Sequence, residues 1–191
     1  MDSVHLLALA SAGDYIAVDR GDRQGTLYEA AAAEFGPALD RLAAGYEADP
    51  DRRRDLRQEI HLQLWRSLAA FDQRCSLKTW TFRVAHNVAV SYVNRERRRR
   101  SPLVSLEDAA MALADKPQDA RIDERRVLER LFEMVRTLKA LDRQILLSYL
   151  EGMDAAAIAE ITGLSAANVS MKVHRIKALL ARRYLEERNH A

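Results

Sequence analysis

The stretch that most constrains this chain lies near its C-terminus, between Asp154 and Lys177, where two short helical patterns meet at a glycine. Asp154 is placed to cap the first helix and Ser165 the second, because each offers a side-chain oxygen to free backbone N–H groups. Gly163 tolerates the positive φ that ends the first helix. Apolar residues at helical spacing predict a shared core of Ile158, Ile161, Leu164, Val169, Val173 and Ile176.

The second of these helices is basic. From Ser165 to Arg183 the sequence has five Lys or Arg residues and no acidic residue. With the preceding turn, this predicts a helix-turn-helix whose second helix enters a DNA major groove. The alternative is an ordinary helical hairpin with a solvated basic face. The net charge of the whole chain is only +2, so contacts with nucleic acid have to come from local clusters of charge.

The rest of the chain predicts an all-α fold of two small helical domains joined by a flexible acidic linker. Ala, Leu, Arg and Glu abound while Gly and Pro number only 7 and 4, which favours helices over sheets. We expect the first domain over residues 26–100, the linker over 101–121 and the second domain over 122–187. Residues 1–25 are weakly patterned and are expected to be partly disordered or to form a short helix over 4–10.

Two helices begin the first domain. One starts at Thr26 and is kinked or restarted near Pro37. The next runs over about 51–70, and its apolar residues Leu56, Ile60, Leu64 and Leu68 recur every four positions. The polar block from Asp55 to Glu59 lies on the opposite face, which taken alone indicates only a solvated surface.

A third helix, predicted over residues 79–100, combines aromatic, amide and basic side chains. One apolar stripe is formed by Trp80, Val84, Val88 and Tyr92, and the other faces carry Phe82, Arg83, His86, Asn87 and Ser91. The helix ends with five arginines in the six positions 95–100. Such a run suits the phosphates of a single strand whose bases stack on aromatic side chains, and the alternative is a solubilising tail.

Several classes of function are excluded. The single cysteine, Cys75, allows no internal disulfide, which fits a reducing compartment and a cytoplasmic location. The histidines do not cluster, no apolar run is long enough to span a membrane, and there is no Gly-rich phosphate loop or nucleophile–base motif. We therefore expect no metal, no cofactor and no enzymatic activity.

In this order, the features resemble a bacterial RNA polymerase sigma factor of the extracytoplasmic-function type (group IV), over about residues 27–184. Four stretches carry the resemblance. Residues 55–65 are similar to the helix that binds the core polymerase, and residues 76–87 are similar to the segment that melts and reads the promoter −10 element. Residues 138–152 are similar to the start of region 4, and residues 158–175 are similar to the helix-turn-helix that reads the −35 element.

The resemblance implies roles for individual residues of the first domain. Contact with a coiled coil on the polymerase β′ subunit is implied for Asp55, Gln58, Glu59 and Trp65. The loop over 72–78 would hold a flipped base of the −10 element, a step made easier when the strand is already melting. Contacts with the −10 strand are implied for Lys78, Trp80, Arg83 and Asn87, with phosphates held by Arg95, Arg97, Arg98 and the two arginines that follow.

For the second domain, the resemblance implies contacts with the −35 duplex from Ser165, Asn168, Ser170, Met171, Lys172, His174 and Arg175. Contacts with phosphates would position the helix, and contacts with base edges would specify the sequence. The family often has Lys or Arg followed by Ser where this chain has Ser170 and Met171. The bases that this helix reads are therefore not defined by the resemblance.

Three functions remain open from the sequence. The first is an initiation factor that binds core RNA polymerase, through the β′ coiled coil and the β flap, together with promoter DNA. The second is a stand-alone helix-turn-helix regulator, which leaves the segment from Trp80 to Arg100 without a role. The third is an inactive module that only sequesters an anti-sigma factor. The resemblance also implies an anti-sigma factor as a partner of the first kind of protein.

Overall fold

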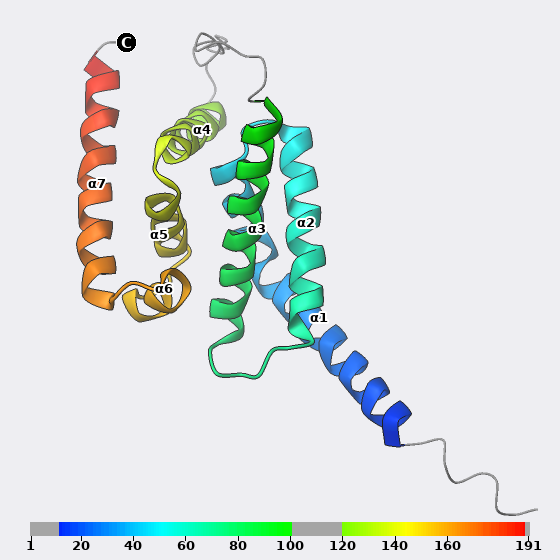
Figure 1. Ribbon diagram of the computed structural model, residues 1–191. Coiled ribbons are helices and arrows are strands. Elements are labelled where there is room, and N and C mark those ends of the chain that lie inside the picture. Colours follow the sequence, from blue (N-terminus) through cyan, green and yellow to red (C-terminus); the bar gives the residue numbers. More distant parts are fainter. Residues whose placement is uncertain (1–11, 101–119, 190–191) are drawn as a thin grey trace, which may run out of the picture.

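The computed structural model describes residues 12–100 and 120–189, and within these ranges it is built of helices (Figure 1). The predictions for a short helix over 4–10 and for a linker beginning at 101 fall largely outside the described residues. The helices are α1 (Ala12–Tyr46), α2 (Pro50–Leu68), α3 (Leu77–Arg100), α4 (Ala120–Thr137), α5 (Ala140–Leu150), α6 (Ala155–Thr162) and α7 (Ala166–Asn189). The all-α prediction is confirmed.

The first half of the molecule is formed by α1, α2 and α3, which pack on one another (Figure 1). The prediction that a helix begins at Thr26 is wrong, because α1 begins at Ala12 and continues through Gly25 and Pro37. An internal glycine weakens a helix by only about 1 kcal/mol. Around Pro37, burial of Phe35, Ala38, Leu39 and Leu42 keeps the helix in place.

The helix α2 begins as its sequence predicts. The Asp49 carboxylate accepts hydrogen bonds from the backbone N–H groups of Asp51 and Arg52, and Pro50 occupies a position whose missing N–H has no cost. The predicted stripe of Leu56, Ile60, Leu64 and Leu68 is buried.

Of the predicted apolar stripe of α3, only Tyr92 lies on the fully buried face. Phe82, Ala85, Ala89 and Tyr92 form the buried face, whereas Trp80, Val84 and Val88 are only partly buried. The buried face widens because α3 contacts α1 and α2 on one side and α5 and α6 on another.

The second half contains α4 to α7, and its helix-turn-helix is built as predicted. The Asp154 carboxylate accepts the Ala157 N–H at 2.7 Å, and the Ser165 hydroxyl accepts the Asn168 N–H at 3.3 Å. Gly163 ends α6 with a φ of 74°. Of the predicted core, Ile158, Val169, Val173 and Ile176 are buried, and Ile161 and Leu164 are partly buried against them.

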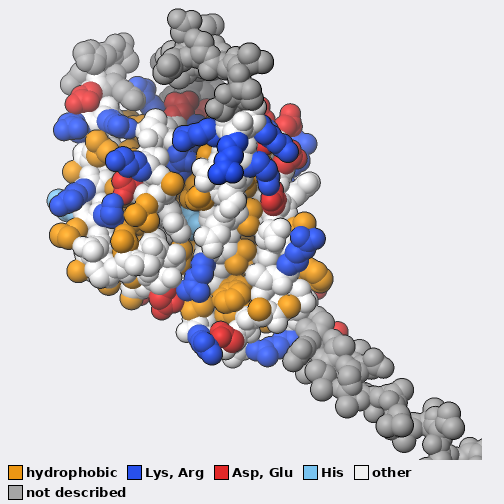
Figure 2. Space-filling model, in the orientation of Figure 1, with side chains coloured by type: hydrophobic (Ala, Val, Ile, Leu, Met, Phe, Trp, Pro, Cys, Tyr) orange, Lys and Arg blue, Asp and Glu red, His pale blue; other side chains and the backbone are white. Residues whose placement is uncertain are grey.

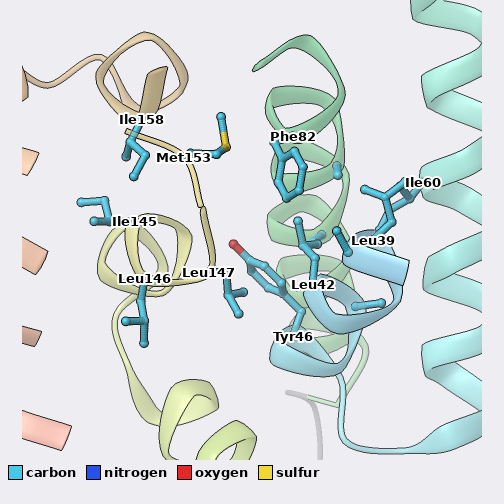
Figure 3. Close-up of a cluster of buried hydrophobic side chains, with 14 of the residues drawn as sticks. Leu39, Leu42, Tyr46, Ile60, Phe82, Ile145, Leu146, Leu147, Met153 and Ile158 are labelled. Atoms are coloured by element: carbon cyan, nitrogen blue, oxygen red, sulfur yellow. The ribbon is translucent and has the colours of Figure 1, made fainter. Parts of the chain in front are cut away.

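The two halves are docked on one another, which the sequence did not predict. In Figure 1 α5 and α6 lie between α7 and the first half, and they contact α1 and α3. The Arg136 guanidinium donates to the Ala44 carbonyl oxygen at 2.8 Å. Figure 3 shows the resulting core, in which Leu147 and Met153 of the second half face Tyr46 and Phe82 of the first. The buried side chains therefore form one continuous cluster.

The buried core of the helix-turn-helix provides a first test. Replacing Ile158, which is 1% exposed, by Ala should lower the free energy of unfolding by about 2–5 kcal/mol because a cavity remains. The matched control is Leu185→Ala on α7, since Leu185 is 49% exposed and its loss should cost less than about 0.5 kcal/mol. Urea unfolding followed by circular dichroism measures both, and equal losses would contradict the placement of Ile158.

Candidate nucleic-acid and protein-binding surfaces

The exposed face of α7 carries most of the side chains predicted to contact a −35 duplex. Those that are exposed are Ser165, Asn168, Ser170, Met171, His174 and Arg175. Lys172 differs, because its ammonium group donates to the Asp142 carboxylate at 2.7 Å and the side chain is partly buried. Further along, the Lys177 ammonium lies 5.4 Å from the centroid of the Tyr149 ring. This face therefore combines a free arginine with cations that already have partners within the chain.

The loop between α2 and α3 is held by its own side chains. The Asp72 carboxylate accepts the Arg74 N–H at 3.2 Å, and Gln73 adopts a φ of 62°. The Ser76 hydroxyl accepts the Thr79 N–H at 3.0 Å and so caps α3. An ordered and largely exposed loop is compatible with the base-holding role predicted for residues 72–78.

Trp80 lies at the base of this loop and faces the protein. Its ring centroid is 5.3 Å from that of Phe71, and its indole N–H donates to the Ser67 hydroxyl at 3.0 Å. The indole is thus fixed against α2, with only part of its surface available to a base.

Lys78 and Arg83, two of the residues predicted to contact the −10 strand, instead contact the second half. The Lys78 ammonium donates to the Glu151 carbonyl oxygen at 2.7 Å. The Arg83 guanidinium donates to the Glu160 carbonyl oxygen at 3.3 Å and lies 3.9 Å from the Glu160 carboxylate. Asn87, one turn further along α3, is exposed.

The C-terminal end of α3 presents a group of arginines on the surface (Figure 2). Arg95, Arg97 and Arg98 are exposed, as predicted. An open surface pocket beside them is lined by Ser91, Asn94, Arg95, Arg98 and Arg99. Guanidinium, amide and hydroxyl donors around one hollow suit the oxygens of a phosphate.

On α2, Asp55, Gln58 and Trp65 are exposed, and Trp65 shows 46% of its surface beside Leu62 at 47%. Glu59 is engaged, because its two carboxylate oxygens accept from the Arg95 guanidinium at 3.4 and 2.8 Å. This hydrogen bond lowers the pKa of Glu59 below its usual value, and burial opposes the shift. An exposed indole and leucine beside polar groups are typical of a protein-binding surface.

Sequence reasoning missed His86, which it placed on an outer face of α3. The side chain is fully buried where the halves meet, with Nδ1 3.1 Å from the Tyr46 hydroxyl and Nε2 3.0 Å from the Ser148 hydroxyl. The signal that could have found it is its position one turn after Phe82 on the buried face. The outer-face assignment held for Asn87 and Ser91 but not for His86 or Phe82, which are both fully buried.

Burial lowers the pKa of His86 to about 3, so the imidazole is neutral in the folded protein. Burial likewise raises the pKa of Tyr46, which Arg143 opposes from 5.1 Å above the Tyr46 ring. His86 thus joins three helices, α1, α3 and α5, through two neutral hydrogen bonds.

The described residues offer neither a metal-binding cluster nor a membrane-spanning helix. No group of three or more His, Cys, Asp or Glu side chains in residues 12–100 and 120–189 is placed to hold a metal ion. Among the helices of the described part of the chain, none has both the length and the apolar character needed to cross a membrane.

Comparison with known protein families gives two matches. Residues 32–99 match the model for sigma-70 region 2, and residues 128–180 match a model for sigma-70 region 4. Together they cover well over half of the chain, and they correspond to the first half and most of the second.

A curated relative and a solved structure are also similar. The chain is 28% identical over 149 residues to a probable RNA polymerase sigma factor, RfaY, of Xanthomonas campestris pv. campestris. The match includes 76% of this chain and spans 37% of the length of that relative. CnrH, solved in complex with the cytosolic domain of CnrY, has the same fold at a TM-score of 0.62 and 20% identity, with 88% of this chain and 94% of CnrH covered.

The buried imidazole predicts a specific dependence of stability on pH. The unfolded chain binds a proton at His86 near pH 6.5, whereas the folded chain does so only near pH 3. The contribution of this group is therefore complete above pH 6.5 and is lost as the pH falls toward 3. Between pH 7.5 and 5.5 the free energy of unfolding should fall by about 1.4 kcal/mol more in the native protein than in His86→Gln. Urea unfolding at both pH values measures this, and equal decreases would contradict a buried neutral His86.

Proposed function

The chain belongs to the sigma-70 family of RNA polymerase sigma factors, of the extracytoplasmic-function type, and we propose that it is an initiation factor that directs core RNA polymerase to specific promoters. The observation that carries the proposal is the presence of region 2 and region 4 in one chain, in that order. The polymerase would catalyse nucleotide addition, and the chain itself would catalyse no reaction. We place region 2 within residues 26–100 and region 4 within 122–187, in the cytoplasm.

In the proposed complex, α7 binds the −35 element in the major groove. Arg175 supports this role because it is exposed and has no acidic residue near it in the helix. His174 and Met171 share its exposure and offer contacts with base edges and with the thymine methyl group. Lys172 would have to break its ion pair with Asp142 before its ammonium group could bind a phosphate. The Ser165 and Asn168 side chains, at the helix N-terminus, are placed for the phosphate backbone.

The first half is proposed to hold the melted −10 element. The loop over residues 72–78 would receive a flipped base, beside Lys78, Trp80, Arg83 and Asn87. The exposed arginines at the end of α3, Arg95, Arg97 and Arg98, would bind phosphates of the same strand. A pocket of donors at that end supports this assignment.

The exposed face of α2 is proposed to bind the β′ coiled coil. The exposed side chains that can take part are Asp55, Gln58 and Trp65. Glu59 would contact the coiled coil while its carboxylate stays paired with Arg95. An aromatic anchor surrounded by polar groups is the usual composition of an energetically important contact. Region 4 would contact the β flap.

An anti-sigma factor is proposed as a further partner. CnrH, which shares this fold, is found in complex with the cytosolic domain of CnrY. A partner that binds the two halves together would shift the population away from the form that binds polymerase.

Reconstituted transcription tests the proposed function. Core polymerase with this chain should initiate at promoters identified by transcript profiling after overexpression, and core polymerase alone should not. No binding to core polymerase at low salt would contradict the proposal. Tight binding of the isolated chain to a symmetric duplex, independent of polymerase, would instead support a stand-alone helix-turn-helix regulator.

The contact with β′ can be tested by reversing a charge on α2. Asp55→Arg should weaken binding to core polymerase by about tenfold or more, because an exposed acidic group is replaced by a basic one at the interface. The matched control is Glu34→Arg, which makes the same change of charge at an exposed position of α1. Fluorescence titration with core polymerase measures both affinities. A loss equal to that of the control would remove Asp55 from the interface.

The −35 contact can be tested through its dependence on salt. Arg175→Ala should weaken binding of the holoenzyme to promoter DNA and reduce the slope of log K against log salt by about one, because one cation at the DNA is lost. Arg182→Ala is the control, since Arg182 is exposed on the same helix but pairs with Glu186 at 3.7 Å. An unchanged slope for Arg175→Ala would place this residue away from DNA.

A further inference from the structure

The helix α7 is basic in sequence, but most of its basic side chains already have partners in the structure. Between Ser165 and Arg183 these residues are Lys172, Arg175, Lys177, Arg182 and Arg183. Within the part of the chain that the structure describes, Arg175 alone among them has no hydrogen bond, ion pair or ring contact. The sequence-independent affinity of a protein for DNA grows with the number of phosphates that its cations neutralise. The composition of α7 therefore overstates the charge that it offers to DNA.

Three of the engaged cations lie toward the C-terminal end of α7, beyond the residues predicted to contact DNA. Their partners are a ring, a carboxylate and a hydroxyl: Tyr149 for Lys177, Glu186 for Arg182 and Thr137 for Arg183. Lys172 is different, because it lies inside the predicted DNA-binding stretch, three positions before the exposed Arg175. The partner of Lys172 is therefore the one that bears on DNA binding.

This partner is Asp142, in the first turn of α5, the helix that packs against α7. The Lys172 ammonium group lies 2.7 Å from the Asp142 carboxylate, and the exposed fractions of the two side chains are 34% and 26%. Lys139, the residue before α5, makes no side-chain cap, so the free backbone N–H groups of the first turn favour an acidic group there. The helix end thus stabilises the Asp142 carboxylate independently of Lys172.

A carboxylate in this place counteracts Lys172 in whichever direction the lysine points. While the ammonium group donates to Asp142, it is not free to bind a phosphate. If the ammonium group turned to a phosphate, the unpaired carboxylate would repel the DNA from nearby. One cation of α7 is therefore cancelled in both geometries.

We propose that Asp142 is a specificity-determining residue of the −35 site, which lowers the affinity of α7 for DNA of any sequence by holding Lys172 away from the phosphates. Affinity that all sequences share does not help a protein to find one site among many others. With Lys172 withheld, binding depends more on the exposed side chains that can reach base edges, such as Met171, His174 and Arg175. This inference rests on the proposed role of α7 at the −35 element.

Binding of the holoenzyme to two DNA fragments tests the proposal. One fragment is a promoter with its own −35 element, and the other differs only in having that element scrambled. Asp142→Asn should tighten binding to both fragments by about fivefold at about 0.1 M salt and steepen the slope of log K against log salt by about one, because Lys172 becomes free to bind a phosphate. Fluorescence titration at several salt concentrations measures both quantities.

Two further variants separate this effect from a change of net charge or of fold. Glu129→Gln is the matched control, since it removes one exposed carboxylate from α4, which carries none of the predicted DNA contacts. Adding Lys172→Gln to Asp142→Asn should abolish the gain in affinity and in slope. An equal gain in Glu129→Gln, or a gain that persists in the double variant, would overturn the proposal. Unchanged or weaker binding of Asp142→Asn would also overturn it, because an ion pair that only holds α5 against α7 predicts that result.

The pairing itself can be tested with neither polymerase nor DNA. Acylation of Lys172 in the full-length protein by an amine-reactive ester is followed by peptide mass spectrometry. The rate should be about twofold or more higher in Asp142→Asn than in the wild type, because the carboxylate no longer holds the ammonium group. The Glu129→Gln protein should react as the wild type does. Equal rates in all three proteins would overturn the proposal.

Failure of this inference is distinguishable from failure of the proposed function. A wild-type holoenzyme that binds the two fragments equally would contradict the role of α7 at the −35 element. The effect of Asp142→Asn on the scrambled fragment would still decide whether Asp142 lowers the sequence-independent affinity. If no holoenzyme forms, the proposed function is contradicted, and the acylation rates of Lys172 decide whether the pairing holds.

Discussion

The close approach of α1 to α5 at Gly45 is the contact on which the arrangement of the two halves depends. A Cβ at this position would lie 2.8 Å from both terminal methyl carbons of Leu147, so either the Leu147 side chain would have to turn aside or α5 would have to move away from α1. Such a movement would also separate Ser148 from His86 and Glu151 from Arg41 and Lys78. One small residue therefore permits a set of contacts that joins α1 and α3 of the first half to α5 and the residue that follows it.

Several side chains that are proposed to bind DNA already have a partner within the folded chain. Lys78 and Arg83, which are proposed to contact the −10 strand, both donate to backbone oxygens of the second half. Lys172 on α7 is similarly paired with Asp142. By contrast, Arg97, Arg98 and Arg175 are exposed, whereas Arg95 is paired with Glu59, so part of each proposed DNA surface is available in the docked arrangement.

Local features of the sequence predicted local structure well, because their causes lie within a few residues. The caps at Asp154 and Ser165, the turn at Gly163 and the buried stripe of α2 follow from backbone geometry and from periodicity. The face of α3 was assigned wrongly because its burial is decided by α5 and α6, which are distant in sequence. The same holds for His86, whose partner Ser148 is 62 positions away. The residues of the candidate surfaces were named from the family resemblance. Most of them are exposed, but Lys78, Arg83, Lys172 and the Glu59–Arg95 pair have partners within the chain, and Trp80 is partly buried.

The separation of the two halves is the quantity that tests the account most directly. Fluorescent labels on cysteines at Ala33 of α1 and Ala181 of α7, both exposed positions, would report it by energy transfer after replacement of Cys75 by Ser. The docked arrangement predicts a single high-transfer population for the protein in solution. A broad distribution at low transfer would contradict it.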